Sequence, residues 1–373
     1  MRVKLGTALN YEQPTKYIVE SEKYNDEYKT PVLTAGKSFI LGYTNEENGI
    51  YDNLPVIIFD DFTTEIKFVD FPFKVKSSAM KMLQPSSEAY NLKYFYYLIK
   101  YLNFQPTSHQ RHWISKFTEF EFDIPDRQKQ DEIVEKLDKL CEMTSLKQEE
   151  LKKYDELVKS QFIEMFGDVN NNPKNWQINK LQDVCSSIVR GPFGSALKKD
   201  FFVEKDETTY KVYEQKNAIQ KSEKLGTYYI TKEKYEELKR FECKPNDFIM
   251  SCSGTMGELY QLPIGSEKGI INQALCKFTL NDKINSIVFL EFMKDAIRNI
   301  ETKGSGIQNI ASVVYIKNLD IYVPPIELQN KFADFVKHID KLKFCEKNTT
   351  FFENLCYNII KNMHFTVKRG ENG

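Results

Sequence analysis

Two stretches far apart in the chain share one pattern, FDIPDRQKQDEIVEKLDKL at 122–140 and IYVPPIELQNKFADFVKHIDKL at 321–342. Aligned without a gap, they match a proline, a glutamine and the apolar positions around them at a constant offset of 199. The matched pairs are Ile124 with Val323, Pro125 with Pro324, Gln130 with Gln329, Ile133 with Phe332, Leu137 with Val336 and Leu140 with Ile339. Because this period is too long for a solenoid, the pattern indicates the tandem duplication of a whole domain.

The similarity extends beyond these stretches. YFYYLIKYL (94–102) is similar to VFLEFMKDA (288–296), and VKLGTAL (3–9) is similar to NKLQDVC (179–185). Each copy is therefore expected to contain a globular part followed by a helical part. The expected divisions are globular parts at 1–125 and 176–324, helices at 126–167 and 325–365, a linker at 168–175 and a flexible tail at 366–373.

The helical parts carry apolar residues at spacings of three and four, which is typical of an amphipathic helix. Residues 126–166 contain neither glycine nor proline. A helix this long needs a partner for its apolar stripe. We expect the two helices to pack antiparallel on each other, and the alternative is that each packs on its own domain. The residues expected in this packing are Ile133, Leu137, Leu140, Leu151, Val158, Phe332, Val336, Ile339 and Ile360.

The globular parts mix strands and helices. The patterns predict strands at 55–62 and 65–75 with a helix at 90–103, and then strands at 247–253 and 272–280 with a helix at 286–300. The expected fold class is therefore α/β (α+β). It would comprise two similar domains separated by two long antiparallel helices, with a pseudo-twofold internal repeat.

Composition narrows the function classes. The 373 residues include 52 Lys and Arg against 53 Asp and Glu, so the chain is not a strongly basic nucleic-acid binder. Aromatic residues reach 13%, which is too many for a disordered chain. The seven cysteines form no CxxC pair, and we expect reduced thiols. With no long apolar run and no signal-peptide core, the expected location is cytoplasmic.

Motifs for catalysis are weak. His109 and His112 are three residues apart without further zinc ligands nearby, so ordinary histidines are favoured over a metal site. Asp60 and Asp61 follow an apolar strand, where an ordinary loop is favoured over metal binding. The chain has no phosphate-binding loop, no GxGxxG and no amino-methyltransferase tetrapeptide. These observations favour a protein that is not an enzyme, with no metal site and no cofactor of its own.

Glycine-rich and polar strings occur in both copies. Glycine lets a backbone approach a surface closely, and Ser, Thr, Asn, Gln, Lys and Arg offer groups to phosphates and base edges. The strings are TAGKSFILGYT (34–44), DDFTTEIK (60–67), SHQRHWISK (108–116), RGPFGSALKKDFF (190–202), SGTMGELYQ (253–261) and KGSGIQNI (303–310). The alternative for each string is an ordinary turn, with its side chains in structural or solvent-facing roles. As binding loops they would contact DNA through Lys37, Thr63, Lys67, Gln110, Arg111, Arg190, Phe193, Ser195, Lys198, Lys199, Thr255, Gln308 and Asn309.

Taken together, the duplicated unit and its strings resemble the DNA-specificity subunit of type I restriction-modification systems. The two proline–glutamine helix starts carry the resemblance, together with LVKSQFIEMFGD (157–168) and RGPFGSALKK (190–199). The first copy departs from the pattern at Asp126, where the second copy has a second proline. The resemblance covers essentially the whole chain.

The resemblance implies two target-recognition domains that each read half of a split DNA site, with the helices as spacer. It implies a non-catalytic subunit that recruits two modification subunits using S-adenosylmethionine, and restriction subunits using ATP and Mg²⁺. The sequence leaves two alternatives open, a nuclease on a helical scaffold and a helical interaction protein without a DNA role.

Overall fold

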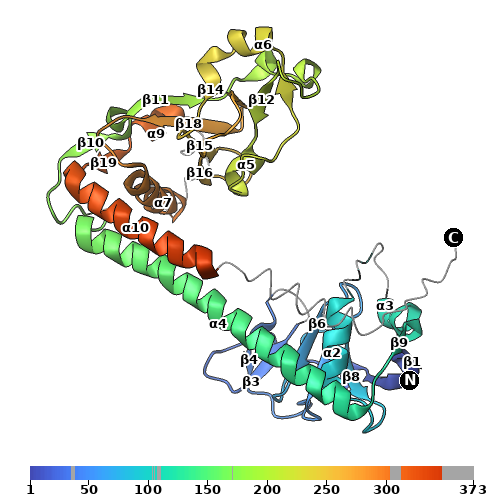
Figure 1. The fold of residues 1–373 in the computed structure, drawn as a ribbon. Coiled ribbons are helices and arrows are strands. Elements are labelled where there is room, and N and C mark those ends of the chain that lie inside the picture. Colours follow the sequence, from blue (N-terminus) through green and yellow to red (C-terminus); the bar gives the residue numbers. More distant parts are fainter. Residues whose placement is uncertain are drawn as a thin grey trace. The chain divides into compact units, whose positions relative to one another are not determined.

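The computed structural model describes residues 1–34, 38–102, 104, 106, 111–169, 171–302 and 312–346. These residues form two compact units (Figure 1). Unit 1 contains Met1–Glu150 and unit 2 contains Leu151–Cys345. The boundary falls inside the longest described helix, α4 (Arg127–Phe166), so each unit includes one part of that helix.

Unit 1 is built on a four-stranded antiparallel sheet with the order β2-β8-β5-β6. A smaller sheet has the order β4-β3-β7, in which β3 and β7 are parallel, and β1 pairs with β9. The strands are β1 (Arg2–Lys4), β2 (Leu9–Glu12), β3 (Thr30–Leu33), β4 (Ile40–Thr44), β5 (Val56–Asp60), β6 (Ile66–Val69), β7 (Lys74–Val75), β8 (Met80–Pro85) and β9 (Glu121–Asp123). The helices are α1 (Leu5–Ala8), η1 (Pro14–Tyr17), α2 (Leu92–Tyr101), α3 (His112–Ser115) and η2 (Phe117–Glu119).

Unit 2 is built on an antiparallel sheet with the order β11-β18-β15-β16 and a smaller sheet with the order β13-β12-β17-β14. Its strands are β10 (Ile178–Lys180), β11 (Cys185–Arg190), β12 (Tyr210–Tyr213), β13 (Tyr229–Ile230), β14 (Glu242–Cys243), β15 (Phe248–Ser251), β16 (Leu259–Gln261), β17 (Gly269–Ile271), β18 (Leu275–Leu280) and β19 (Asp320–Tyr322). Its helices are η3 (Leu181–Val184), η4 (Gly194–Ala196), η5 (Lys199–Phe201), α5 (Gln215–Ile219), α6 (Lys232–Glu237), η6 (Lys239–Phe241), α7 (Ser286–Thr302), α9 (Val313–Lys317) and α10 (Ile326–Glu346).

The two units share one topology. The main sheet of unit 2 repeats that of unit 1, with β11, β18, β15 and β16 in the places of β2, β8, β5 and β6. In each smaller sheet one strand pair is parallel, β3 with β7 and β12 with β17. The pairing of β10 with β19 likewise repeats that of β1 with β9. The expected α+β class with an internal repeat is therefore confirmed. The predicted ranges contain the expected strands and helices, except that the single strand predicted at 65–75 is wrong: β6 and β7 lie there in different sheets, with Pro72 between them.

A buried glutamine attaches each long helix to its own domain. The side chain of Gln130 donates to the carbonyls of Ala89 (3.0 Å) and Pro125 (2.9 Å) and accepts from the amide of Asn91 (2.8 Å). Gln329 makes the same three bonds, with Lys283, Pro324 and Asn285, at 3.1, 2.8 and 2.8 Å. Both glutamines are at most 1% exposed. The identical contacts explain why this residue is the same in both copies.

The apolar stripe of α4 divides between two cores. In unit 1, Ile133 and Leu137 are buried against α2 and the main sheet, and Leu140 packs beside them. There the helix packs on its own domain, as the alternative expectation had it, while the part of the second helix beyond Glu346 lies outside the described residues. The reason is local, because α2 offers a large apolar face of its own that includes Phe95 and Leu98.

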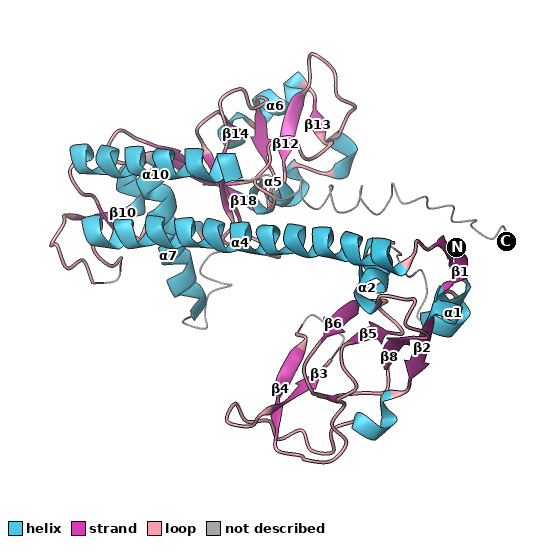
Figure 2. Cartoon of the chain, turned by 60° about the horizontal axis from the view of Figure 1, so that its bottom comes forward, coloured by secondary structure: helices cyan, strands magenta, loops and turns pink. Residues whose placement is uncertain are grey.

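In unit 2 the end of α4 does pack on α10, as the favoured expectation had it. Val158, Phe162 and Phe166 share one core with the α10 residues Phe332, Val336 and Ile339. The rings of Phe162 and Phe332 are 5.6 Å apart, and Lys343 bonds to Asp155 at 2.6 Å, so the two helices run antiparallel (Figure 2). Leu151 is half-buried, and Ile360 lies outside the described residues.

Candidate nucleic-acid interface

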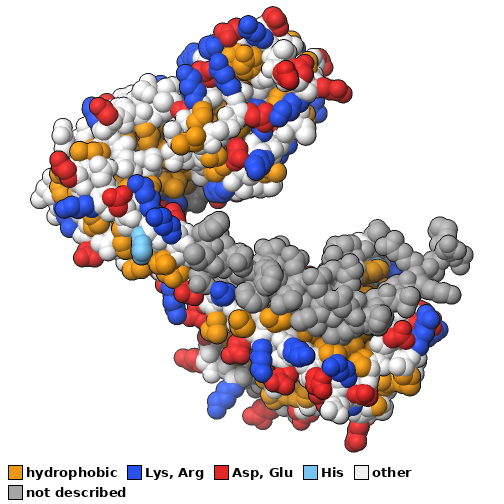
Figure 3. Space-filling view, viewed as in Figure 1, with side chains coloured by type: hydrophobic (Ala, Val, Ile, Leu, Met, Phe, Trp, Pro, Cys, Tyr) orange, Lys and Arg blue, Asp and Glu red, His pale blue; other side chains and the backbone are white. Residues whose placement is uncertain are grey.

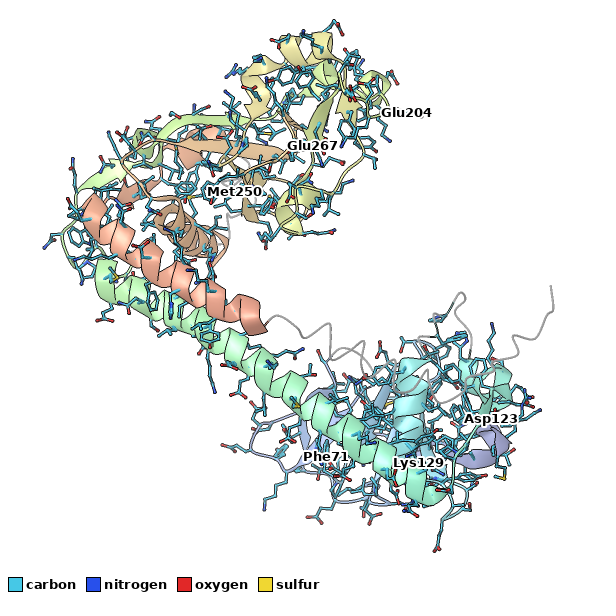
Figure 4. The ribbon with its side chains drawn as sticks, viewed as in Figure 1. Phe71, Asp123, Lys129, Glu204, Met250 and Glu267 are labelled. Atoms are coloured by element: carbon cyan, nitrogen blue, oxygen red, sulfur yellow. The ribbon has the colours of Figure 1, made fainter. Side chains whose placement is uncertain are left out.

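One end of each main sheet gathers the candidate loops. In unit 2 the end of β11, the start of β18, the end of β15 and the start of β16 meet there. The register shows this, since Arg190 pairs with Cys276, and Met250 pairs with both Cys276 and Leu259. Met250 is labelled in Figure 4 and is buried within the sheet. We call this the loop end.

The glutamine attachments lie at the other end of each sheet. The partners of Gln130 follow the last residues of β8, and those of Gln329 follow the last residues of β18. Each unit thus has a helix-attached end and an opposite loop end. This arrangement leaves the loops free of the helix attachment within their own unit.

Arg190 ends β11 at the loop end of unit 2. Its Nε donates to the carbonyl of Gln273 at 3.2 Å and its Nη2 to that of Cys252 at 3.3 Å. The guanidinium carbon lies 5.3 Å from the ring centroid of Phe193. Arg190 therefore joins three neighbouring loops, the ones that follow β11, β15 and β17.

The turn between β15 and β16 lies beside this loop. The hydroxyl of Ser251 donates to the carbonyl of Thr255 at 2.6 Å and shapes the turn, while the Thr255 side chain is exposed. The hydroxyl of Ser253 donates to the amide oxygen of Gln215 at 2.8 Å, which brings α5 to the same place. Of the residues predicted in unit 2, Arg190, Phe193 and Thr255 come together here.

The other predicted residues of unit 2 lie along the same segment. Ser195, in η4, is exposed, and Lys198 and Lys199 are exposed at η5. From there the chain leads to the smaller sheet, where the rings of Phe202 and Tyr228 stack at 4.3 Å. Gln308 and Asn309 lie outside the described residues.

A buried ion pair organises the loop end of unit 1. Lys81 and Asp61 are both fully buried, and the Nζ of Lys81 lies 3.2 Å from Asp61 Oδ2. Lys81 also donates to Gln13 Oε1 at 3.0 Å. The other oxygen of Asp61 accepts from the amide of Trp113, and its carbonyl accepts from the amide of His112, both at 2.8 Å. Asp61 thereby ties the start of α3 to the turn between β5 and β6.

This tie brings two predicted residues to one end of the sheet. Thr63 is exposed in the turn, where Asp60 Oδ1 accepts the amides of Phe62 and Thr63 at 2.8 and 2.7 Å. Arg111 is exposed at the N-cap of α3. Lys67 lies on β6, with its Nζ 5.8 Å from the ring centroid of Phe39. Lys37 and Gln110 lie outside the described residues.

Two motifs were weighed for metal binding, and three of their four residues are described. Asp60 shapes its own turn and Asp61 holds Lys81, so both carboxylates have structural partners. His112 is buried on α3, and His109 lies outside the described residues. The described part of the chain contains no group of three or more His, Cys, Asp or Glu side chains placed to hold a metal ion.

Charges at these surfaces are mixed rather than of one sign (Figure 3). Residues 1–125 hold 14 basic against 16 acidic side chains, and residues 176–324 hold 21 against 19. Several lysines of unit 2 are neutralised locally. An example is Lys205, which pairs with Glu267 at 2.8 Å. By these counts neither globular part carries the large positive net charge that binds DNA strongly by charge alone.

Buried groups next to the Arg190 loop show its electrostatic effect. The pKa of the Cys252 thiol is lowered, first by a hydrogen bond with Cys276 and then by the charge of Arg190, against the opposing effect of burial. The pKa of Cys276 is raised by the same hydrogen bond and by burial. The charge of Arg190 therefore contributes to the lowered pKa of a thiol that is buried next to this loop.

Two residues of these ends escaped the sequence reading. Gln215 has no motif around it and reaches the loop end only through the packing of α5 on β15 and β16. Lys81 stands in the strand MKMLQP (80–85), and no motif marks it. A lysine inside an otherwise apolar strand is the one signal that points to a buried acidic partner.

Comparison with known proteins identifies the second half of the chain. Residues 173–350 match the family model for the type I restriction modification DNA specificity domain. This chain carries a domain of that family. The specificity domain therefore includes the whole of the Arg190 loop and the turn between β15 and β16.

A relative is similar to this chain in sequence, and two solved structures are similar to it in fold. Over 153 residues the chain is 50% identical to the EcoR124I/EcoR124II type I restriction enzyme specificity subunit of Escherichia coli. That match spans 38% of this chain and 38% of the relative.

The type I restriction-modification S subunit of M. genitalium has a similar fold, with a TM-score of 0.59 at 14% identity, over 99% of this chain and 96% of that one. A structure described as showing complex assembly and conformational transition of the type I R-M system has a TM-score of 0.55 at 12% identity, over 95% of this chain and 97% of that one. At these identities the likeness concerns the fold. None of the helices in the described ranges has the length and apolarity that a bilayer span requires.

Proposed function

We propose that this chain is the DNA-specificity subunit of a type I restriction-modification complex. In this proposal it reads a bipartite DNA site, with one half-site for each unit. The observation that carries the proposal is the duplication: two units with the same topology, each attached to a long helix through the same glutamine, and a specificity domain in the second.

Recognition takes place at the two loop ends in this proposal. Loop side chains enter the grooves and read base edges, while phosphate contacts fix the position of each unit. Because the two loop ends differ in sequence, the two half-sites differ as well. The gap between the half-sites is set by the helical segments that follow each globular part.

The chain supplies recognition and its partners supply chemistry. Two modification subunits bring S-adenosylmethionine and methylate adenine, and restriction subunits in the full complex use ATP and Mg²⁺. The near-neutral charge of both globular parts supports dependence on such partners, since non-specific DNA affinity comes mostly from phosphate neutralisation.

A methylome tests the proposal. The chain is expressed with its neighbouring modification subunit in a host that lacks adenine methylation, and single-molecule sequencing maps N6-methyladenine. The expected result is one split motif with a fixed gap that appears only when this chain is present. A soluble and associated pair of proteins that methylates no motif would contradict the proposal, as would methylation of a motif without a gap.

A further inference from the structure

The loop after β11 displays an aromatic ring to solvent. Phe193 is 66% exposed, between Pro192 and Gly194. Gly194 has a φ of +64°, and a Cβ placed on it would meet no atom within 4 Å. Single exposed apolar residues are ordinary on protein surfaces. The exposure of Phe193 gains meaning only from the way in which its loop is held.

The root of this loop is fixed in place. A Cβ on Gly191 would lie 1.9 Å from the carbonyl oxygen of Asn272, so the two backbones touch there. The amide of Gly191 donates to the carbonyl of Leu275 at 3.0 Å. The Arg190 side chain adds its bonds to the carbonyls of Gln273 and Cys252. A ring held on such a root needs little ordering when it binds a ligand.

Arg190 and Phe193 have different roles in this geometry. The Nε and Nη2 of Arg190 donate to backbone carbonyls, which holds the guanidinium against the root of the loop. The guanidinium also covers one face of the Phe193 ring at 5.3 Å. A ring inserted between two stacked bases needs both faces, so the geometry favours contact through the free face or the edge. The apolar group that base edges offer in the major groove is the methyl group of thymine.

We propose that Phe193 contacts the C5 methyl group of a thymine in the half-site read by unit 2, with Arg190 as its positioning residue. This inference rests on the proposed function. The neighbouring polar pair of Ser253 and Gln215 lies at the same loop end, so the apolar contact is set among groups that can hydrogen-bond.

Unit 1 has no such ring in the equivalent place. There the chain leaves β2 through Gln13 and enters η1, which contains Tyr17. The hydroxyl of Tyr17 donates to Glu12 Oε1 at 3.0 Å, and its ring lies against Tyr51 with centroids 5.0 Å apart. Because this aromatic packs inward, the described segment that follows β2 offers no equivalent ring, and we place the thymine contact in the half-site read by unit 2.

The test uses the full chain in complex with its modification subunit. Each thymine of both half-sites is replaced in turn by uracil, which removes only the methyl group, and the affinity for each duplex is measured. For the natural chain, loss of one buried methyl group should weaken binding about fourfold at one thymine of the unit 2 half-site. With Phe193→Ala, the duplex with that thymine should bind more weakly, and its replacement by uracil should make no further difference.

The chain offers a matched control for this substitution. Ile264 is 88% exposed and is also flanked by a proline and a glycine, Pro263 and Gly265. It follows β16, at the end of the sheet opposite to the loop end. Ile264→Ala should leave both the affinity and the discrimination between thymine and uracil unchanged.

Several outcomes overturn the inference. One is a unit 2 half-site that contains no A·T pair. Another is a preference for thymine over uracil that remains unchanged in Phe193→Ala. An equal effect of Ile264→Ala would show that the loss is not specific to the loop end. If the chain directs no bipartite methylation at all, the proposed function itself fails. If the chain directs bipartite methylation but no replacement of thymine by uracil changes the affinity, only the thymine contact is refuted.

Discussion

Replacing the buried glutamine of either copy should detach a long helix from its domain. In Gln329→Ala, the amide of Asn285 and the carbonyls of Lys283 and Pro324 lose their partner. An unsatisfied buried polar group costs about 1–3 kcal/mol, and part of this site is reached by water. The expected loss is therefore about 3 kcal/mol of the free energy of unfolding of unit 2, or roughly 6–12 °C in its melting temperature.

The chain carries two natural reporters for this measurement, one in each unit. Trp113 is fully buried in unit 1, and Trp176 packs against the core of unit 2. With Trp113→Phe, tryptophan fluorescence during urea unfolding follows unit 2, and with Trp176→Phe it follows unit 1. Gln329→Ala should lower the urea midpoint seen by Trp176, and Gln130→Ala should lower the midpoint seen by Trp113 by a similar amount.

Gln128 provides the control, since it lies two residues from Gln130 in the same helix turn and is exposed. Gln128→Ala should change the free energy of unfolding by less than about 0.5 kcal/mol, as is usual for surface substitutions. If Gln130→Ala cost no more than Gln128→Ala, the hydrogen bonds of the buried glutamine would not be what holds the helix. If Gln130→Ala and Gln329→Ala differed severalfold, the two attachments would not be equivalent.

Four further predictions follow from the contacts of the two units. Asp61→Ala should destabilise unit 1 by about 3–5 kcal/mol in urea unfolding, because a buried lysine loses its partner. The pKa of Glu46 lies below its ordinary value of 4.5, because hydrogen bonds from Lys74 and two backbone amides outweigh the effect of burial. The ionised Glu46 therefore stabilises the folded chain above pH 4.5, and this stabilisation is lost as the pH falls through the lowered pKa of the folded state. Glu46→Gln should therefore flatten the acid side of a stability-against-pH curve. Exchange of residues 1–125 for another recognition domain should change one half of the methylated motif only. Deletion of a heptad within 140–158 should shorten or abolish the tolerated gap between half-sites.

Each of these has a result that would refute it. An Asp61→Ala variant as stable as the natural chain would mean that the lysine finds water or another partner. If Glu46→Gln lost stability at low pH as steeply as the natural chain, other carboxylates would be responsible for that loss. A domain exchange that altered both halves, or neither, would contradict modular reading. A gap that was unaffected by the heptad deletion would show that the helices do not set it.

The repeat was predictable from the sequence because its helix starts keep one gap-free register. Pro125 and Gln130 recur as Pro324 and Gln329 with apolar residues at the same spacing, and local patterns of this kind survive divergence. The strong strands were predictable for a similar reason. Val56 to Phe59 form an unbroken apolar run, and all four side chains are buried.

The partner of each helical stripe was not predictable in the same way. An amphipathic pattern states that one face is buried but not against what. The stripe of α4 is continuous in sequence, yet Ile133 packs on α2 while Phe162 packs on α10. The smaller sheets escaped prediction too. Their parallel pairs join short strands distant in sequence, β3 with β7 and β12 with β17, and such non-local pairing leaves no local pattern.

The interiors beneath the two loop ends show where divergence was tolerated. Phe59 pairs with Lys81 in unit 1, and Met250 pairs with Cys276 at the same register position in unit 2. Two residues further along the strand stand Asp61 and Cys252. The buried ion pair of one unit thus occupies the place of a hydrogen-bonded thiol pair in the other.

At the opposite ends, the glutamine bonds to the helices are the same in both units. If the proposed function holds, identical attachment and divergent loop supports are what two different half-sites require. The helices must be held alike in both units, while each recognition surface needs its own set of anchored loops.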